Sequence, residues 1–534
     1  MDMTPHFPIY LDYGATTPVD PRVADAMIPW LREHFGNAAS RSHAWGWEAE
    51  EAVEKARKQV ADLIGADPRE IVWTSGATES DNLAIKGAAH FYQGKGKHLI
   101  TVKTEHKAVL DTMRELERQG FEVSYLDVQE NGLLDIEVFK AAIRPDTILA
   151  SVMAVNNETG AVQPVDEVAR LAARAGAWAH SDAVQALGHA PIDFAACGLD
   201  LMSLSAHKIG GPVGVGALLA RRDVVPRAVG LGGGQEREVR SGTVPVALAA
   251  AFARAASLAV AELDSEAPRL ATLRDRIAGL AVAAGGRVNS RPDGAPHIVN
   301  VTFDGVRADD LLFLLDQRGV HASVGSACRA GVHQPSDVLM AMGRTADEAT
   351  QSVRFSLGRT STEADVDLLA RALPEALDEL AAGPDRELPR RIVLVALDDP
   401  DDAGRDLIDA LGHHHEVHLI CAEGIPFDTT QAGSAFLRHH ASRRPGENMP
   451  GDSTPAGAPR SGSLLHQVQY ELRRDLPAAP RQFADQSLQI HACHGPDRQV
   501  EVLRDALCGL FTDDPSLQPR DVVVLCTSIA EYAP

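Results

Sequence analysis

The chain has 534 residues, too many for one hydrophobic core, so several domains are expected. Apolar residues make up 45% of it, enough for globular folding, and a net charge of −23 argues against non-specific nucleic-acid binding by the whole surface. Six cysteines without paired spacings, no signal peptide and no run of about 18 apolar residues indicate a cytoplasmic protein that is neither exported nor inserted in a membrane.

Strands and helices alternate through the first 260 residues. The expected helices include Trp47–Leu63 and Lys107–Gln119. The expected strands are short and apolar: Ile71–Trp73, His98–Lys103, Phe121–Leu126, Thr147–Met153 and Leu201–Leu204. This alternation predicts an α/β domain with a mostly parallel sheet covered on both faces. We place this large domain over residues 1–15 together with 16–260.

A second pattern begins near residue 261. Its expected elements are a helix near Leu270–Ala284, strands near Val299–Phe303 and Val353–Ser356, and a helix near Glu363–Ala382. Together they predict a smaller α+β domain over residues 261–385.

The chain after residue 385 changes character. Two strands, Arg391–Leu397 and Glu416–Cys421, flank a helical stretch at Asp401–Leu411. They predict a β-α-β fragment within residues 386–440, which is too small to fold alone.

Residues 441–463 are rich in Arg, Pro, Gly and Ser and predict a disordered linker. The segment 464–534 that follows contains an apolar stretch, Val522–Leu525. We expect this tail to pair a strand with the β-α-β fragment, which would make it a stability element.

Two segments that follow predicted strands suit the binding of a flat, phosphorylated ligand. Thr74–Ser80 opens a helix over about Glu79–Ala89, and its glycine lets the backbone approach a phosphate that the helix dipole favours. Thr104-Glu105-His106 ends the next strand, where His106 could stack on a ring.

Further along the chain, Asp182 follows a strand, with Gln185 three residues later, and Lys208 stands between a strand and a glycine-rich turn. A lysine amine inside a pocket loses hydration, so its pKa falls and its lone pair attacks aldehydes. Pyridoxal phosphate needs such an amine, a carboxylate at its pyridine nitrogen, a donor at its phenolic oxygen and a phosphate cradle. These residues together predict that cofactor, whereas Lys208 taken alone is more typical of a solvated surface turn.

Cys328 lies in Ser323–Gly331, a stretch of small residues that predicts a mobile loop. Arg329 beside it favours the thiolate, which is the nucleophilic form of cysteine. A structural cysteine is the alternative that the residues alone leave open.

Residues 9–385 resemble the cysteine desulfurases of iron–sulfur assembly. The resemblance is carried by ordered motifs: Tyr10–Pro18, Phe35–Asn37, Ser40–His43, Thr74–Leu83, Lys103–Lys107, Val155–Gly160, Asp182, Gln185, Ser205–Lys208, Arg240–Thr243, Gly325–Cys328 and Val353–Arg359. It implies the fold-type-I architecture of pyridoxal-phosphate-dependent transferases: a large, mostly parallel sheet domain and a smaller α+β domain, here with an extra C-terminal α/β fragment. Val338 follows ten positions after Cys328, and this spacing resembles the family's long-loop class.

The resemblance also implies residue roles. Catalysis falls to Cys328, which would accept the substrate sulfur as a persulfide, to Lys208 as Schiff-base and proton-transfer residue, and to His106 as stacking acid–base. The implied cofactor-binding set is Ala77, Thr78, Asn157, Asp182, Gln185, Ser205, His207, Lys208 and Thr243, the last reaching a neighbouring subunit's phosphate in a homodimer. The implied substrate-binding set is Asn37, Asn157 and Arg354. No metal is expected, apart from transient iron–sulfur ligation by Cys328.

The implied activity converts L-cysteine to L-alanine and passes sulfur to acceptor proteins for iron–sulfur cluster assembly or tRNA thiolation. The alternatives are a desulfurase associated with DNA phosphorothioation or DNA repair, and a selenocysteine lyase. No membrane or direct nucleic-acid partner is expected.

The sequence departs from the family pattern in two places. The family's acidic–aromatic ending, which helps dock the scaffold protein, is replaced here by the linker and the β-α-β fragment, so docking to a scaffold does not follow from the resemblance. The last 70 or so residues instead resemble a fragment of the gamma subunit of exodeoxyribonuclease V, a RecC-type protein, without its remaining domains. Asn37-Ala38-Ala39 also stands where the family often has Asn-Pro-Ala.

Overall fold

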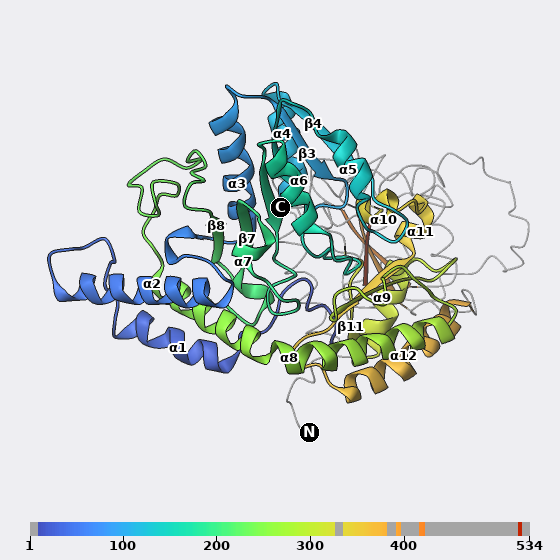
Figure 1. Ribbon diagram of the computed structural model, residues 1–534. Coiled ribbons are helices and arrows are strands. Elements are labelled where there is room, and N and C mark those ends of the chain that lie inside the picture. The colour runs from blue at the N-terminus through green and yellow to red at the C-terminus, as the bar shows by residue number, and fades with distance from the viewer. Residues whose placement is uncertain (1–8, 326–334, 382–390, 397–415, 422–521, 526–534) are drawn as a thin grey trace, which may run out of the picture. The chain divides into compact units, whose positions relative to one another are not determined.

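The computed structural model describes residues 9–325 and 335–381, together with three strands at 391–396, 416–421 and 522–525 (Figure 1). The chain divides into two compact units. The first contains the two long described ranges, and the second contains the three strands.

A seven-stranded sheet forms the centre of the first unit. Its strands are β2 (Ile71–Thr74), β3 (His98–Val102), β4 (Glu122–Leu126), β5 (Thr147–Ser151), β6 (Trp178–Asp182), β7 (Leu201–Ser205) and β8 (Gly216–Ala220). They lie in the order β2-β8-β7-β6-β5-β3-β4. All neighbours from β7 to β4 pair in parallel, and only β8 runs antiparallel to its two neighbours. The predicted mostly parallel sheet is therefore confirmed.

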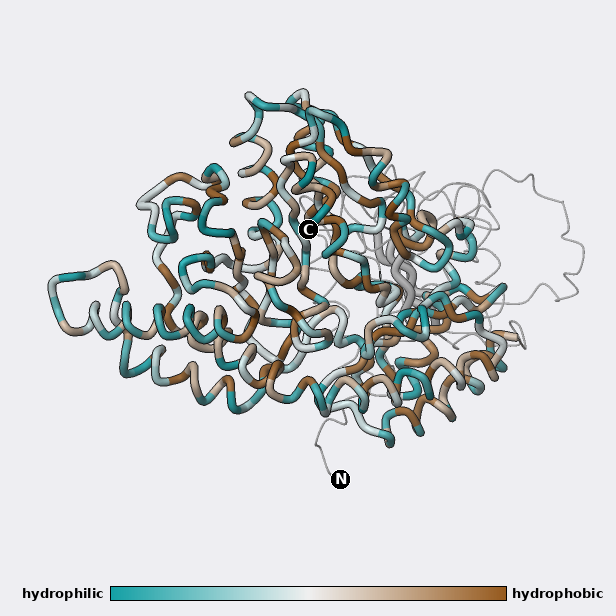
Figure 2. The backbone as a smooth tube through the Cα atoms, viewed as in Figure 1, coloured by the Kyte–Doolittle hydropathy of each residue, from teal (hydrophilic) through white to brown (hydrophobic). Residues whose placement is uncertain are grey.

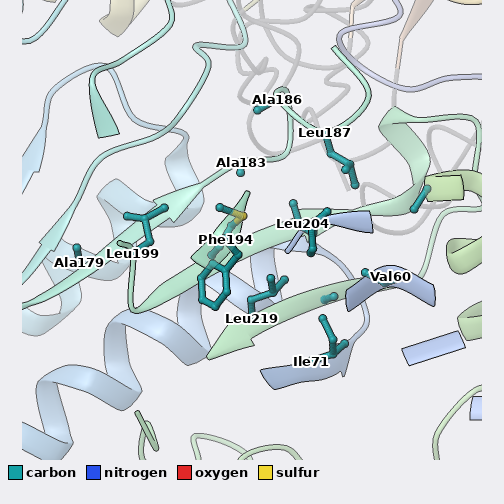
Figure 3. Packing of buried hydrophobic residues seen from close by; sticks show 14 of the residues in the cluster. Val60, Ile71, Ala179, Ala183, Ala186, Leu187, Phe194, Leu199, Leu204 and Leu219 are labelled. Carbon is teal, nitrogen blue, oxygen red and sulfur yellow. The ribbon is translucent and has the colours of Figure 1, made fainter. Parts of the chain in front are cut away.

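Both faces of this sheet are buried. Successive side chains of a strand point to opposite faces, so neighbouring strand residues that belong to different apolar clusters show burial on each face. Ile71 and Leu219 belong to one apolar cluster, and their neighbours Val72 and Leu218 belong to another. Figure 3 shows the first cluster, in which Phe194 packs beside strand residues of the sheet. Continuous apolar strands follow from burial on two sides.

Helices cover the two faces and connect the strands. They are α1 (Pro21–Arg32), α2 (Ala44–Leu63), α3 (Ala77–Tyr92), α4 (Lys107–Arg118), α5 (Ile136–Ala142), α6 (Val165–Arg174) and α7 (Phe194–Cys197), with short 3-10 turns at η1 (Pro68–Glu70) and η2 (Ala206–Lys208). Helices α3 and α4 pack on each other, and α3 also contacts β5, β6, β7 and β8. Strands β2 to β6 are each followed by a helix at the same edge of the sheet, whereas β8 runs in the opposite direction.

A second sheet and its helices form the smaller part of the first unit. The antiparallel sheet has the order β12-β10-β9, built from β9 (Arg287–Val288), β10 (Ile298–Thr302) and β12 (Ser352–Ser356). A parallel pair joins β1 (Ile9–Tyr10) to β11 (Val320–His321). The helices are α9 (Ala308–Gln317), α10 (Asp337–Ala341), α11 (Ala346–Thr350) and α12 (Glu363–Ala381). Residues of β10, β12, α9 and α12 share one apolar cluster.

One long helix, α8 (Val246–Ala283), links the two parts. In Figure 1 it runs from beside α1 and α2 to α12, and the domain boundary predicted at residue 260 falls inside it. The sequence gives no break there because an apolar, alanine-rich helix continues on both sides of that residue.

Helix α8 is also long and apolar enough to cross a membrane by length and composition alone, with a mean hydropathy of 1.7 over its most apolar stretch. Sequence inspection missed this stretch, which Arg254 interrupts. Figure 2 shows apolar and polar residues mixed along the helix, and 44% of the stretch is buried. The main core includes Ala249, Phe252 and Ala253 of this helix. Helix α8 is therefore a core helix of the first unit.

The second unit contains a three-stranded parallel sheet. It consists of β13 (Arg391–Ala396), β14 (Glu416–Cys421) and β15 (Val522–Leu525), in the order β14-β13-β15. Val393 pairs with Val522, so the tail does add a strand to the predicted β-α-β fragment. The predicted helix 401–411 and linker 441–463 lie outside the described residues.

Candidate active site

A cavity of about 550 Å³ opens where the parallel strands end. This volume falls within the usual range of about 300–1,000 Å³ for small-molecule sites, and the carboxyl edge of a parallel sheet is the usual place for them. Loops after β2, β3, β6 and β7 line it, together with Arg354 of β12. The predicted site residues that line it are Ala77, Thr78, His106, Asn157, Asp182, Gln185, Ser205, His207, Lys208 and Arg354.

Lys208 ends the 3-10 turn that follows β7. Its Nζ donates hydrogen bonds to the carbonyl oxygens of Gly14 and Ala15, each at 2.6 Å. Burial and the nearby Arg354 cation lower the pKa of this amine to about 8, against the opposing effect of Asp12 and Asp182. A useful fraction of the amine is therefore neutral, and nucleophilic, near neutral pH.

Asp182 is the last residue of β6, and only 6% of it is exposed. One carboxylate oxygen accepts a hydrogen bond from the Val184 N–H at 3.0 Å. Burial raises the pKa of the carboxyl, whereas the Val184 hydrogen bond, His106 and Lys208 act to lower it. A buried carboxyl beside a cavity can hold a protonated ring nitrogen.

The N-terminus of α3 opens toward the cavity. Gly76 caps the helix without any side-chain hydrogen bond, so the first backbone N–H groups have no side-chain partner at the cap. A Cβ at Gly76 would meet no heavy atom within 4 Å, which leaves room above the N–H groups of Ala77 and Thr78. Unpaired N–H groups and the positive end of the helix dipole together suit a phosphate.

His207 and Ser205 lie beside this helix terminus. His207 shares a hydrogen bond of 3.1 Å between its Nδ1 and Thr16 Oγ1. Burial and Lys208 lower the pKa of His207 to about 4, so the ring is neutral at physiological pH. Neutral donors next to a helix terminus bind an anion by hydrogen bonding.

His106 is the N-cap of α4, and it is exposed on the cavity side. Its Nδ1 accepts a hydrogen bond from the Ala108 N–H at 3.1 Å. A ring whose Nδ1 accepts carries its proton on Nε2 when neutral, and this fixes both tautomer and orientation.

Arg354 lies in β12 and is 3% exposed. Its guanidinium forms an ion pair with Asp12 and donates from Nη1 to the Asn157 carbonyl oxygen at 2.8 Å. Its Nε is buried and has no hydrogen-bond partner. A Cβ at Gly14 would stand 3.2 Å from Arg354 Cζ, so glycine there lets the guanidinium lie against the backbone.

Three predicted residues are not brought to the cavity by the described chain. Asn37 is exposed between α1 and α2, where its Oδ1 accepts from the Ala39 N–H. Thr243 is exposed between β8 and α8, which leaves its predicted role toward a neighbouring subunit a prediction. Cys328 lies outside the described residues.

Two buried carboxyls at the cavity were missed by sequence reasoning. Glu105 accepts from the Met153 N–H at 2.5 Å through Oε1, and its buried Oε2 has no partner. Glu158 accepts from Ser336 Oγ at 2.5 Å. Burial raises the pKa of both carboxyls. Glu105 stands in the motif that ends at His106, and its position directly after a buried strand was the available signal.

The comparisons with known proteins agree with this geometry. Residues 9–369 match the aminotransferase class-V family. The chain belongs to this family. It is 53% identical over 386 residues to cysteine desulfurase IscS of Dechloromonas aromatica, covering 71% of this chain and 94% of that one. It is 54% identical over 381 residues to the IscS of Anaeromyxobacter dehalogenans, covering 70% and 93%.

Solved structures show the same relationship. A NifS-like protein superposes with a TM-score of 0.66 at 37% identity, covering 70% of this chain and all of that one. DndA from Streptomyces lividans superposes with a TM-score of 0.56 at 41% identity, covering 64% and 97%. The fold is that of the pyridoxal-phosphate-dependent class-V aminotransferases, and pyridoxal 5′-phosphate is the cofactor. The family match ends at residue 369, and the resemblance of the tail to a RecC-type subunit stays a prediction.

Proposed function

We propose that this chain is a cysteine desulfurase that converts L-cysteine to L-alanine and delivers the sulfur as a persulfide of Cys328. The observation that carries the proposal is the convergence on one cavity of the Lys208 amine, the Asp182 carboxyl, the open N-terminus of α3 and the Arg354 guanidinium. Relatives at 53% identity that carry the name cysteine desulfurase support it.

The residues of the cavity fit the cofactor group by group. Lys208 offers a partly neutral amine to the aldehyde, and Asp182 offers a buried carboxyl to the ring nitrogen. The N–H groups of Ala77 and Thr78, with Ser205 and His207 beside them, would hold the phosphate. When bound, pyridoxal phosphate supplies an electron sink that weakens the bonds at the substrate α-carbon.

Arg354 and Asn157 are the residues proposed to hold the substrate carboxylate. The guanidinium is already fixed in place by Asp12 and by the Asn157 backbone, so little side-chain entropy is lost when a carboxylate binds. A planar guanidinium can bind a carboxylate through two parallel hydrogen bonds.

Proton transfer falls to two neighbouring groups. The Lys208 amine, released when the substrate amine takes its place, can accept a proton from the substrate α-carbon and return it elsewhere. His106 carries a proton on Nε2 at the cavity edge and can exchange it with the substrate thiol.

Sulfur transfer is assigned to Cys328. The Cys328 thiolate attacks the substrate sulfur. The carbon–sulfur bond of the substrate breaks, and the electron pair of that bond remains with the organic fragment. That fragment takes up a proton and leaves as alanine, while Cys328 keeps the sulfur as a persulfide for an acceptor protein.

The pathway and location belong to the same proposal. We place the enzyme in the cytoplasm, feeding iron–sulfur cluster assembly or tRNA thiolation, because IscS enzymes are the relatives and the cysteines lack paired spacings. DNA phosphorothioation and selenocysteine cleavage are the alternatives. The first is tested by assaying sulfur acceptors, and the second by comparing selenocysteine with cysteine as substrate.

A homodimer is proposed from exposed apolar side chains of the first unit. Phe35 and Trp45 stack with ring centroids 5.0 Å apart while remaining 69% and 48% exposed, and Trp47 of the same helix as Trp45 is also exposed. Large exposed aromatics in one place are typical of an interface. Sedimentation equilibrium should give a dimer that Phe35→Ser with Trp45→Ser weakens, whereas Phe313→Ser, at an exposed position of α9, should leave it intact. A wild-type monomer would refute the proposal.

The activity is tested with two variants. Purified protein should absorb visible light, and borohydride should fix the cofactor covalently to Lys208, so Lys208→Ala should show no such fixation. Cys328→Ser should keep the cofactor but lose alanine and persulfide formation, because a hydroxyl does not accept sulfur as a thiolate does. Covalent fixation in Lys208→Ala, or normal alanine formation by Cys328→Ser, would contradict the assignment.

A further inference from the structure

A buried histidine from the smaller part of the first unit reaches the cofactor loop of the larger part. His297 directly precedes β10 and is 1% exposed. Its Nε2 lies 3.1 Å from Oε1 of Gln185, which follows β6 and lines the cavity. No sequence pattern connects these two residues, which are 112 positions apart.

The hydrogen bonds fix which way the Gln185 amide points. Gln185 Nε2 donates to the carbonyl oxygen of Gly14 at 2.9 Å, and that oxygen can only accept. The amide oxygen therefore faces His297, whose Nε2 must be the donor. Each end of the amide has a partner that suits only one orientation.

The second ring nitrogen agrees with this tautomer. His297 Nδ1 is buried and has no hydrogen-bond partner, as expected for the nitrogen without a proton. The ring stacks on His189 with centroids 3.6 Å apart and an angle of 17°. Burial, His189 and the cations Arg354, Lys208 and Arg274 all lower the pKa of His297, so the ring stays neutral.

The Gly14 carbonyl oxygen also accepts from Lys208 Nζ at 2.6 Å. The Gln185 amide nitrogen and the Lys208 amine thus converge on one acceptor. A phenolic oxygen next to the Lys208 nitrogen, as pyridoxal phosphate provides, would lie within reach of the second hydrogen of the amide.

We propose that His297 is a positioning residue: by donating to Gln185 Oε1, it keeps the amide nitrogen directed at the phenolic oxygen of the cofactor. This inference rests on the proposed function. An amide hydrogen bond to that oxygen stabilises its negative charge most when the neighbouring Schiff-base nitrogen of Lys208 has lost its proton. His297 therefore keeps the pKa of that nitrogen low.

The test is a visible absorption titration of the purified holoenzyme without substrate. His297→Phe keeps a flat ring on His189 but removes the donor, and should raise the pKa of the Schiff-base nitrogen by about 1 unit, the scale of one hydrogen bond. His297→Gln restores a donor and should return the value toward that of the wild type.

A double variant distinguishes an effect of His297 through the Gln185 amide from a general effect of the substitution on the fold. In Gln185→Ala the amide is absent, so adding His297→Phe should cause no further shift. An unchanged pKa in His297→Phe, or an equal shift in the Gln185→Ala background, would overturn the inference. A wild-type protein without a borohydride-sensitive visible band would instead overturn the proposed function, so the two failures are distinct.

Discussion

A buried ion pair protects the edge of the central sheet, and removing half of it should be costly. β2 is an edge strand. Arg57 Nη1 donates to the Ile71 carbonyl oxygen at 2.7 Å, and the Trp73 N–H donates to Glu236 at 2.9 Å. Arg57 and Glu236 also bind each other through two hydrogen bonds of 2.9 Å. The pair therefore satisfies the outward backbone groups of β2 and anchors the segment before Thr243.

Glu236→Ala should remove the buried carboxylate that pairs with Arg57, leaving its cation with the exposed Glu54 and the Ile71 carbonyl oxygen, and should leave the Trp73 N–H unpaired. Arg57 is 8% exposed and Glu236 is 2% exposed, so water cannot easily replace either group. Breaking a buried pair in this way costs about 3–5 kcal/mol of unfolding free energy. Glu236→Gln, which keeps the shape and one acceptor oxygen, should lose less.

The assay is urea unfolding followed by far-UV circular dichroism at saturating cofactor. Asp62→Ala removes an exposed ion pair with Lys58 and is the matched control, with an expected loss of at most about 0.5 kcal/mol. If Glu236→Ala were no less stable than this control, the pair would not carry the edge of the sheet and the reasoning would be wrong.

Two further predictions concern the amine and the tail. Cofactor capture by the apoprotein should accelerate about tenfold per pH unit below about pH 8 and level off above it, because the pKa of Lys208 is lowered to about 8 and only the neutral amine reacts. A pH-independent stopped-flow rate would contradict this. Deleting residues 441–534 removes β15 but none of the described residues that line the cavity, so alanine formation should stay within about two-fold at equal cofactor occupancy. A tenfold loss would show that the tail contributes to catalysis.

The order of elements and the cofactor chemistry follow from the sequence alone. Alternating apolar strands and amphipathic helices predict a parallel sheet, since only burial on both faces suits runs such as Ile71–Trp73. Polar residues directly after strands, such as Asp182 and Lys208, predict a site at the carboxyl edge. These signals are local, because each concerns residues a few positions apart.

Contacts between distant segments were decided only by the tertiary structure. The predicted boundary at residue 260 falls within α8, since the packing of a helix against two parts of a fold leaves no mark in its composition. Glu236 accepts a hydrogen bond from the Trp73 N–H of a strand 163 residues away, and His297 hydrogen-bonds the Gln185 side-chain amide 112 residues away. A buried polar side chain takes whichever partner the fold brings to it, so its role depends on long-range packing and not on its neighbours in the chain.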